Sequence, residues 1–214
     1  MKYKGVLFDF DGTLVNSMEE HYKGWKFALE RFSIDLKPVD LYVLEGQGVE
    51  RVASQMLQKN NVSQAHLTEV MDAKRAYFEK HNQVRLYPGV PEVLKWLQEN
   101  GIKMGVVTGG DRARVVRALR DFSVDTFFNG IITADDVTHT KPHPEPFIEG
   151  ANALGILPAE CVVVENAPLG ISAAKASGAY CVALTTTLPE KKLREADRVL
   201  KDYQELLNYL KKLR

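Results

Sequence analysis

The sequence predicts an α/β fold in which a doubly wound parallel sheet is interrupted by a small inserted helical bundle. Short apolar runs typical of buried strands alternate with amphipathic helical segments over most of the chain. Residues 17–82 break this alternation, because their apolar residues recur only at helical spacing. A length of 214 residues is enough for one large domain with such an insertion.

The first predicted strand leads directly into two aspartates. The apolar run at 6–8 is typical of a buried strand, and Asp9 and Asp11 follow it before a turn at Gly12 and Thr13. Two carboxylates at the end of a buried strand are costly to desolvate unless a positive group lies between them. A divalent cation would supply that charge, and a phosphorylated substrate would use the same cation. The alternative is a solvated loop that happens to contain two acids.

The inserted helical bundle is expected to form a cap domain over this site. We assign 1–15 and 86–214 to an α/β core and 16–85 to the cap, because the chain crosses into and out of the insert beside the aspartate pair. Three apolar helical faces are predicted in the cap: Trp25, Ala28, Leu29 and Phe32; Val52, Met56 and Leu57; and Val70, Ala73, Tyr77 and Phe78.

The remaining core segments alternate regularly. Predicted helices span 93–99, 113–121, 145–154, 169–176 and 203–213, and predicted strands span 103–107, 130–133, 161–164 and 180–184, with a short strand near Val199. This order is typical of a Rossmann-like parallel sheet with helices on both faces. Ligands bind at the carboxyl ends of the strands in such sheets, so we expect one site at that edge.

Composition excludes several classes of protein. Lys plus Arg and Asp plus Glu both number 28, so no net charge favours nucleic acid or a membrane surface. No run approaches the ~18 apolar residues of a membrane helix, and we expect a cytoplasmic protein, taken to be a monomer. The two cysteines, Cys161 and Cys181, lie in apolar runs and are predicted to be buried free thiols rather than a disulfide or a zinc site.

Four segments together resemble the haloacid dehalogenase-like phosphohydrolases, in the subgroup with a helical cap inserted after the first motif. The resemblance covers essentially the whole chain, and the four motifs are specific as a set although none is specific alone. The matching segments are Asp9 with Asp11, Val107-Thr108-Gly109-Gly110, Lys141-Pro142-His143-Pro144, and Val164-Glu165-Asn166-Ala167-Pro168-Leu169-Gly170.

The resemblance implies a role for each motif. Asp9 would be the nucleophile that forms an aspartyl-phosphate, which splits one difficult step into two. Asp11 would act as the general acid for the leaving group and then as the base for water. Four residues would hold and neutralise the phosphoryl group: the Thr108 hydroxyl, the Gly109 and Gly110 amides, and the Lys141 ammonium.

The implied cofactor is Mg²⁺, which prefers hard oxygen ligands. The expected ligands are Asp9, the backbone carbonyl of Asp11, Glu165 and Asn166. The fourth motif departs from the commonest pattern of the family, in which two acids are consecutive, because Asn166 brings no charge. Glu45 of the cap is a candidate for the extra acid, although it is equally consistent with an exposed acid at a helix end.

The cap carries the information about the substrate. Asn16 and His21 are expected to contact the substrate, and Trp25 shares a helical face with His21. Relatives with such caps include sugar-phosphate phosphatases, β-phosphoglucomutases and inorganic pyrophosphatases. The mutases are similar at His21 and Trp25, but they have a basic residue in the cap loop, where this chain has Glu45 and a displaced Arg51.

The resemblance is therefore greatest to the pyrophosphatase and sugar-phosphatase branch. It implies a phosphohydrolase whose partner is a small phosphorylated metabolite or pyrophosphate. A sugar-phosphate isomerase that uses the same aspartyl-phosphate, or a non-catalytic phosphate-binding protein, remains an alternative.

Overall fold

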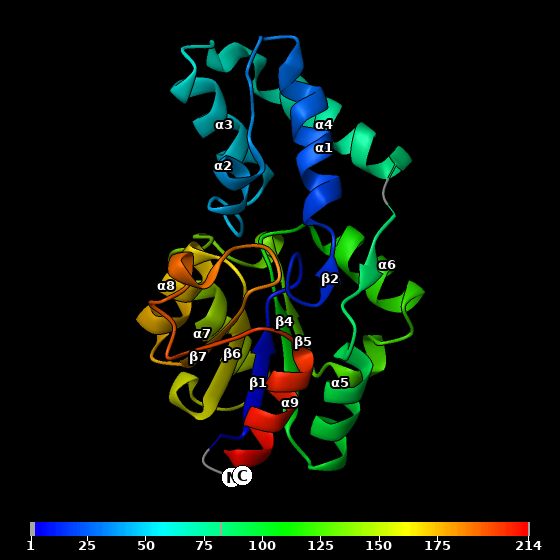
Figure 1. Cartoon of the computed structure of the whole chain (residues 1–214), viewed down its shortest axis with the longest axis vertical. Helices are drawn as coiled ribbons and strands as arrows, with labels where there is room; N and C mark the ends of the chain where they lie inside the picture. The colour runs from blue at the N-terminus through cyan, green and yellow to red at the C-terminus, as the bar shows by residue number, and fades with distance from the viewer. Residues whose placement is uncertain (1–2, 82, 214) are drawn as a thin grey trace.

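The computed structural model describes residues 3–81 and 83–213 and contains a six-stranded parallel sheet. Its strand order is β5 (Gly130–Ile132), β4 (Lys103–Val107), β1 (Gly5–Phe8), β6 (Cys161–Glu165), β7 (Tyr180–Leu184) and β8 (Arg198–Leu200). The strand that precedes the aspartate pair, β1, thus lies near the middle of the sheet (Figure 1). The predicted α/β fold with a parallel sheet is confirmed.

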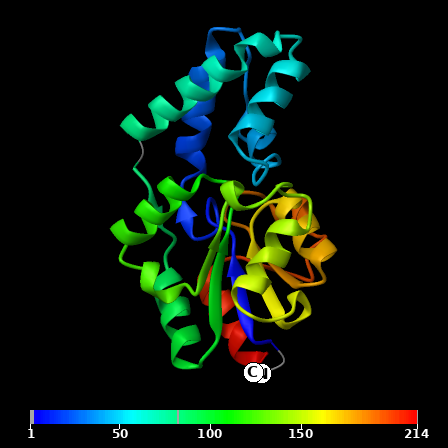
Figure 2. The same ribbon diagram turned by 180° about the vertical axis from the view of Figure 1, so that it is seen from behind.

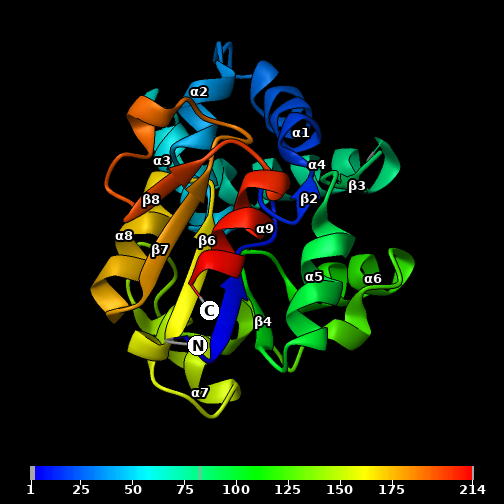
Figure 3. The same cartoon turned by 60° about the horizontal axis from the view of Figure 1, so that its bottom comes forward.

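Helices cover both faces of the sheet. The five core helices are α5 (Val90–Glu99), α6 (Arg112–Asp121), α7 (Glu145–Ala153), α8 (Pro168–Ser177) and α9 (Tyr203–Lys212). Side chains alternate along β1, so Val6 and Phe8 pack with α5, α6 and α9, whereas Leu7 packs with α7 and α8. Figure 3 shows the sheet between these two groups of helices. This two-sided packing is the doubly wound arrangement expected from the sequence.

The inserted segment forms a helical bundle with an apolar core of its own. Its helices are α1 (Met18–Glu30), α2 (Pro38–Tyr42), α3 (Val49–Lys59) and α4 (Leu67–His81), with a single 3₁₀ turn, η1 (Gln64–His66), before α4. Trp25, Leu29 and Leu57 are buried in this core. The bundle stands over the carboxyl end of the sheet (Figures 1 and 2).

A short ribbon joins the two crossings between bundle and core. Strand β2 (Val15–Asn16) pairs antiparallel with β3 (Arg85–Leu86), and Val15 lies opposite Leu86. The ribbon is not predicted from the sequence, because strands of two residues carry no measurable periodicity. The ribbon holds the segments that enter and leave the bundle side by side.

Other differences from the predicted elements are small. Helix α5 begins at Val90 rather than 93, because Pro91 suits the first turn of a helix and Gly89 precedes it in a left-handed conformation (φ +89°). Four short 3₁₀ segments in core loops were also not predicted: η2 (Asp125–Phe127), η3 (Ala134–Asp136), η4 (Pro158–Glu160) and η5 (Glu190–Lys192).

The cysteines and the helices bear on two further expectations from the sequence. Cys161 and Cys181 are buried free thiols, as predicted. None of the helices in the described ranges combines the length and the apolar character needed to cross a lipid bilayer.

Candidate active site

The carboxyl ends of neighbouring strands bring the predicted motifs together. Asp9 follows β1, Thr108 follows β4, and Glu165 is the last residue of β6. Because β4 and β6 flank β1 in a parallel sheet, these side chains meet at one edge. Lys141 reaches the same point from the loop between β5 and α7, although it is distant in sequence.

Lys141 is the centre of a buried ionic cluster. Its side chain is only 1% exposed, and Nζ donates to Asp9 Oδ1 at 2.6 Å and to Glu165 Oε1 at 2.7 Å. The third donor position is used by the backbone carbonyl of Val107 at 3.1 Å. All three ammonium hydrogens therefore have acceptors, which is the condition under which a buried lysine keeps its charge.

Asp9 and Lys141 shift each other's pKa, and Glu165 acts on both groups. Burial raises the pKa of Asp9 to about 7, while Lys141 opposes that rise and Glu165 adds to it. Burial alone would lower the pKa of Lys141, but Asp9 and Glu165 outweigh it and raise the pKa. Asp9 Oδ2 is buried and has no hydrogen-bond partner within the described part of the chain. This oxygen is available to a cation or to an incoming phosphorus atom.

Asp11 has a different environment, although it lies only two residues further on. Ser17 Oγ donates to Asp11 Oδ1 at 2.7 Å, and Arg114 donates to both carboxylate oxygens, Nη1 to Oδ1 at 3.0 Å and Nη2 to Oδ2. Burial alone would raise the pKa of Asp11, but Arg114 and His21 outweigh it and hold the pKa well below its ordinary value. Asp11 is thus held as a carboxylate by a two-pronged arginine contact.

A chain of hydrogen bonds connects Asp11 to the helical bundle. Lys74 Nζ lies 3.0 Å from His21 Nδ1, and His21 Nε2 lies 3.0 Å from Asp11 Oδ1. An ammonium can only donate, so Nδ1 accepts and Nε2 carries the hydrogen given to Asp11. Burial, with help from Lys74, lowers the pKa of His21 to about 4, and burial lowers that of Lys74 to about 8. Phe78 stacks on the His21 ring at 4.3 Å and fixes its plane.

The turn after β4 has the form of a phosphate-binding loop. Thr108 Oγ1 accepts a hydrogen bond from the Gly110 amide at 3.0 Å, so the hydroxyl hydrogen is free to donate elsewhere. A Cβ atom on Gly109 would lie 2.6 Å from the backbone oxygen of Gly46 in the cap loop. Glycine at this position therefore allows the cap loop to approach the turn closely.

The two residues of the fourth motif have different functions in the fold. Glu165 accepts from Lys141 through Oε1 and from the two backbone amides that follow it through Oε2, so its carboxylate is already occupied. Asn166 Oδ1 accepts from Thr13 Oγ1 at 3.0 Å, and Nδ2 donates to Thr187 Oγ1 at 2.9 Å. These contacts orient the amide oxygen of Asn166 toward the first motif, with one lone pair unused.

The donors at this edge fit a hard divalent cation. Asp9 Oδ2 is unpartnered, and Asn166 offers an amide oxygen. Burial, together with the nearby Asp11 and Asp9, raises the pKa of Glu45 to about 8. Asp9 and Glu45 both have a raised pKa in the absence of a cation, and a cation such as Mg²⁺ would stabilise their charged forms.

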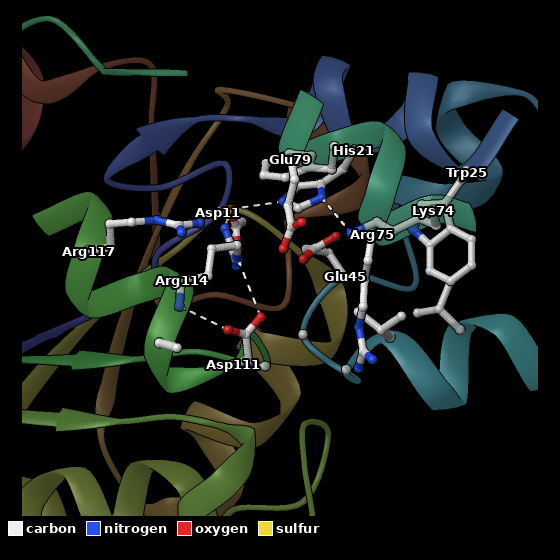
Figure 4. A pocket seen from close by; sticks show the side chains of 18 residues that line it. Asp11, His21, Trp25, Glu45, Lys74, Arg75, Glu79, Asp111, Arg114 and Arg117 are labelled. Carbon is white, nitrogen blue, oxygen red and sulfur yellow. Dashed lines mark hydrogen bonds and ion pairs between the residues drawn. The ribbon is translucent and has the colours of Figure 1, made fainter. Parts of the chain in front are cut away.

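A cavity of about 410 Å³ adjoins Asp11 between the cap and the core. Figure 4 shows Glu45 in the middle of the labelled side chains, with Arg114 on the side of the core and Lys74 on that of the cap. The wall of the cavity contains both charged and apolar side chains. The charged members are Asp11, Glu45, Lys74, Arg75, Glu79, Asp111, Arg114 and Arg117, and the apolar members include Trp25, Val49, Val52 and Phe78.

The structure places most of the predicted site residues in two adjoining groups. The first is the buried cluster at the strand ends: Asp9, Lys141, Glu165, Asn166 and Thr108. The second is the cavity, whose wall includes Asp11, His21, Glu45, Gly109 and Gly110. Asn16 does not line the cavity; it belongs to β2 and pairs with Arg85 in the ribbon.

Sequence reasoning missed Lys74 and Arg114. A signal for Lys74 was present, because it lies between Val70 and Phe78 on one apolar helical stripe, where a lysine is out of place. Arg114 is in the first turn of the helix after the phosphate-binding turn. Nothing in that position distinguishes it from the neighbouring Arg112, which instead pairs with Asp136.

Comparison with known proteins gives consistent matches. The family profile described as "Haloacid dehalogenase-like hydrolase" matches residues 6–184. Validoxylamine A 7'-phosphate phosphatase of Streptomyces hygroscopicus subsp. limoneus is 35% identical over 205 residues, which cover 95% of this chain and 96% of that protein. Pyrophosphatase PpaX of Bacillus mycoides is 30% identical over 219 residues, covering 100% and 99%. The crystal structure of a hydrolase from Pseudomonas syringae aligns with a TM-score of 0.87 and 26% identity, covering 98% of each chain.

Proposed function

This chain belongs to the haloacid dehalogenase-like hydrolases and is a phosphohydrolase, and on that basis we propose that it cleaves a small phosphomonoester with Mg²⁺ as cofactor. The proposed intermediate is an aspartyl-phosphate on Asp9. The observation that carries this proposal is the unpartnered Asp9 Oδ2, buried beside Lys141 at the end of β1. A carboxylate held in this way is oriented for attack, and no hydrogen bond from the described residues to Oδ2 competes with it.

The proposed chemistry uses both aspartates. An Asp9 oxygen forms a bond to phosphorus while the bond from phosphorus to the leaving-group oxygen breaks, and Asp11 gives its proton to that oxygen. Water then attacks the phosphoryl group, Asp11 takes a proton from the water, and phosphate leaves Asp9. The Thr108 hydroxyl holds a phosphoryl oxygen throughout, and the Lys141 ammonium neutralises phosphoryl charge from its position beside Asp9.

The cofactor has one role in this scheme. Bound Mg²⁺ would neutralise phosphoryl charge and orient the group for in-line attack. Asp9, the backbone carbonyl of Asp11 and Asn166 would hold it, with Glu45 as a further ligand from the cap. Glu165 would act on Lys141, since its own oxygens already have partners.

The cavity supports an organic leaving group. Asp11 lines the cavity, so the group that receives its proton would lie there. A volume of about 410 Å³ exceeds the needs of a second phosphate and falls within the range of pockets for small organic ligands. The mixed wall, with Trp25 and Val52 beside Lys74 and Glu45, suits a carbon skeleton that carries hydroxyl groups.

Pyrophosphate is the second candidate, because Lys74 and Arg114 face the cavity and would bind a leaving phosphate.

A direct assay separates the candidates: phosphate release and isomerisation are measured with a polyol phosphate, glucose 1-phosphate and pyrophosphate. We expect kcat/KM for the best ester to exceed that for pyrophosphate by at least tenfold. A preference for pyrophosphate would select the second candidate, and net isomerisation of glucose 1-phosphate would select a mutase.

Replacing Glu45 with glutamine is expected to raise the Mg²⁺ concentration needed for half-maximal activity by about tenfold, corresponding to about 1.4 kcal/mol of lost binding. The physical reason is that the third converging carboxylate is lost while its size is kept. Activity is measured against Mg²⁺ concentration. Glu79→Gln is the matched control, because Glu79 lines the same cavity and is not placed at the cation site. An unchanged Mg²⁺ requirement in Glu45→Gln would remove Glu45 from the ligand set.

Replacing Arg114 with methionine is expected to relax the pKa of Asp11 toward its ordinary value. A carboxyl group with a depressed pKa in the folded state stabilises the protein above its unfolded pKa, and this stabilisation is lost as pH falls through the folded pKa. The free energy of unfolding should therefore be higher for the wild-type protein than for Arg114→Met. This difference should be largest at pH 7 and should shrink below about pH 4.

Urea unfolding at several pH values measures this gap. Arg117→Met is the control, because Arg117 is on the same helix and lines the same cavity. A gap between the wild-type protein and Arg114→Met that does not change with pH would contradict the role assigned to Arg114.

A further inference from the structure

The loop that carries Lys141 also carries an exposed group of metal-binding side chains. His139, His143 and Glu145 each present a nitrogen or carboxylate oxygen within 4.8 Å of the others. The two histidine side chains are 56% and 49% exposed, and none of the three residues lines the cavity beside Asp11. The group is therefore separate from the proposed Mg²⁺ site.

The spacing of these atoms matches a tetrahedral metal centre. Glu145 Oε2 lies 2.8 Å from His139 Nδ1 and 3.7 Å from His143 Nδ1. Ligands at 2.0–2.1 Å from zinc are roughly 3.3 Å from each other, and the two observed distances lie on either side of that value. The imidazole ring centroids lie 4.6 Å apart with an interplanar angle of 33°, and both rings approach the Glu145 carboxylate through Nδ1.

The surrounding contacts already orient two of the ligands. Glu145 accepts backbone hydrogen bonds from Thr138 at 2.7 Å and from His139 at 3.0 Å, which hold the carboxylate in place. His143 Nδ1 accepts from the Glu145 amide at 3.2 Å, so this nitrogen is unprotonated, as metal binding requires. A bound cation would take the place of the hydrogen that His139 Nδ1 gives to Glu145, and the neutral ring would then carry its hydrogen on Nε2.

We propose that His139, His143 and Glu145 form a second metal site, which takes a borderline divalent ion such as Zn²⁺ or Co²⁺ with water as the fourth ligand. Two imidazole nitrogens favour these ions over Mg²⁺, which prefers oxygen donors. Binding exchanges the hydrogen bonds of His139 and His143 within the group for bonds from both Nδ1 atoms to the metal, and each neutral imidazole keeps its hydrogen on Nε2.

The position of the site connects it to the rest of the molecule. Lys141 lies between His139 and His143 in the chain, and Thr140 Oγ1 donates to the backbone oxygen of Gln47 in the cap loop at 2.9 Å. A bound ion would bridge the two ends of this loop and restrict its motion. We therefore expect Zn²⁺ to raise the melting temperature of the full chain through this site.

The test measures Zn²⁺ stoichiometry by equilibrium dialysis of the full chain in excess Mg²⁺. The wild-type protein is expected to bind one more equivalent than His139→Ala or His143→Ala, and visible absorption of tetrahedral Co²⁺ should be lost in both variants. His66→Ala is the matched control, because the partly exposed His66 pairs with Glu69 at 3.0 Å but has no second histidine in the pair. All variants should keep wild-type phosphatase activity before Zn²⁺ is added.

Two outcomes would overturn the proposal. Equal Zn²⁺ stoichiometry in the wild-type protein and in both alanine variants would show that these residues bind no ion. An equal loss of bound Zn²⁺ in His66→Ala would show that Zn²⁺ binds to surface histidines in general. Zn²⁺ could also replace Mg²⁺ at the proposed Mg²⁺ site. That replacement would add the same amount of bound Zn²⁺ to every variant, so the difference in stoichiometry between variants would not change.

Discussion

Replacing Asp9 with asparagine is expected to lower kcat by a factor on the order of 10⁵ or more, as is typical when a covalent nucleophile is removed. The amide has nearly the same size, and Lys141 keeps Glu165 as a partner, so the fold should persist. Phosphate release under saturating substrate measures the loss, and circular dichroism checks the fold. A residual rate above about one percent of wild type would contradict the assignment of Asp9.

The control for this substitution is Asp111→Asn. Asp111 also lines the cavity, and it caps α6 by accepting from the Arg114 amide at 2.9 Å, which asparagine can do equally well. We expect turnover within a few fold of wild type. A comparable loss in both variants would mean that negative charge in the cavity, rather than a nucleophile at position 9, is what matters.

Stability gives a second, independent readout for Asp9. Burial raises the pKa of Asp9 to about 7, so its contribution to stability is fully present below its unfolded pKa of about 4 and is lost as pH rises through 7. Asparagine does not ionise. The free energy of unfolding of Asp9→Asn relative to wild type should therefore improve between pH 5 and pH 8.

The core elements could be predicted because each has a local signal. Strands β6 and β7 are short apolar runs bounded by turns, and their predicted limits agree within one residue with the structure. Each predicted motif lies after such a run. Since parallel strands share one carboxyl edge, predicting the strands also predicted that Asp9, Thr108 and Glu165 would meet.

The contacts that adjust Asp11 could not be predicted, because they are long-range. Arg114 is 103 positions from Asp11, and Lys74 is 53 positions from His21. No periodicity links such pairs, and each depends on how the cap is oriented on the core. Phe78 illustrates the same limit: it was expected in the cap core, but it stacks on His21 and lies 5.7 Å from the Arg114 guanidinium.

The two aspartates have opposite pKa shifts in the substrate-free protein. The pKa of Asp9 is raised and that of Asp11 is lowered, whereas a nucleophile should be charged and a general acid protonated. A cation beside Asp9 favours its charged form. Substrate oxygens that draw Arg114 away from Asp11 would let its pKa rise. The proposed mechanism therefore requires ligand binding to reverse both shifts.

Replacing Lys141 with methionine is expected to destabilise the fold by about 3–5 kcal/mol, since it leaves buried carboxylates without their counter-charge. Asp9 and Glu165 both lose a hydrogen bond of 2.7 Å or less. The folded-state pKa of Asp9 would rise further, so the stability of the variant should fall as pH rises from 5 to 8. Urea unfolding measures the loss, and turnover should fall below detection because the phosphoryl group loses its buried cation.

A second variant separates the charge from the packing of the lysine. Glu165→Gln added to Lys141→Met removes one uncompensated carboxylate, so the double variant should be more stable at pH 8 than the single variant while remaining inactive. Lys175→Met is the surface control: its partner Asp197 is partly exposed, and such pairs contribute at most about 1 kcal/mol. If the double variant were no more stable than Lys141→Met, the destabilisation would be explained by lost packing around the aliphatic part of the lysine side chain and not by loss of the ionic cluster.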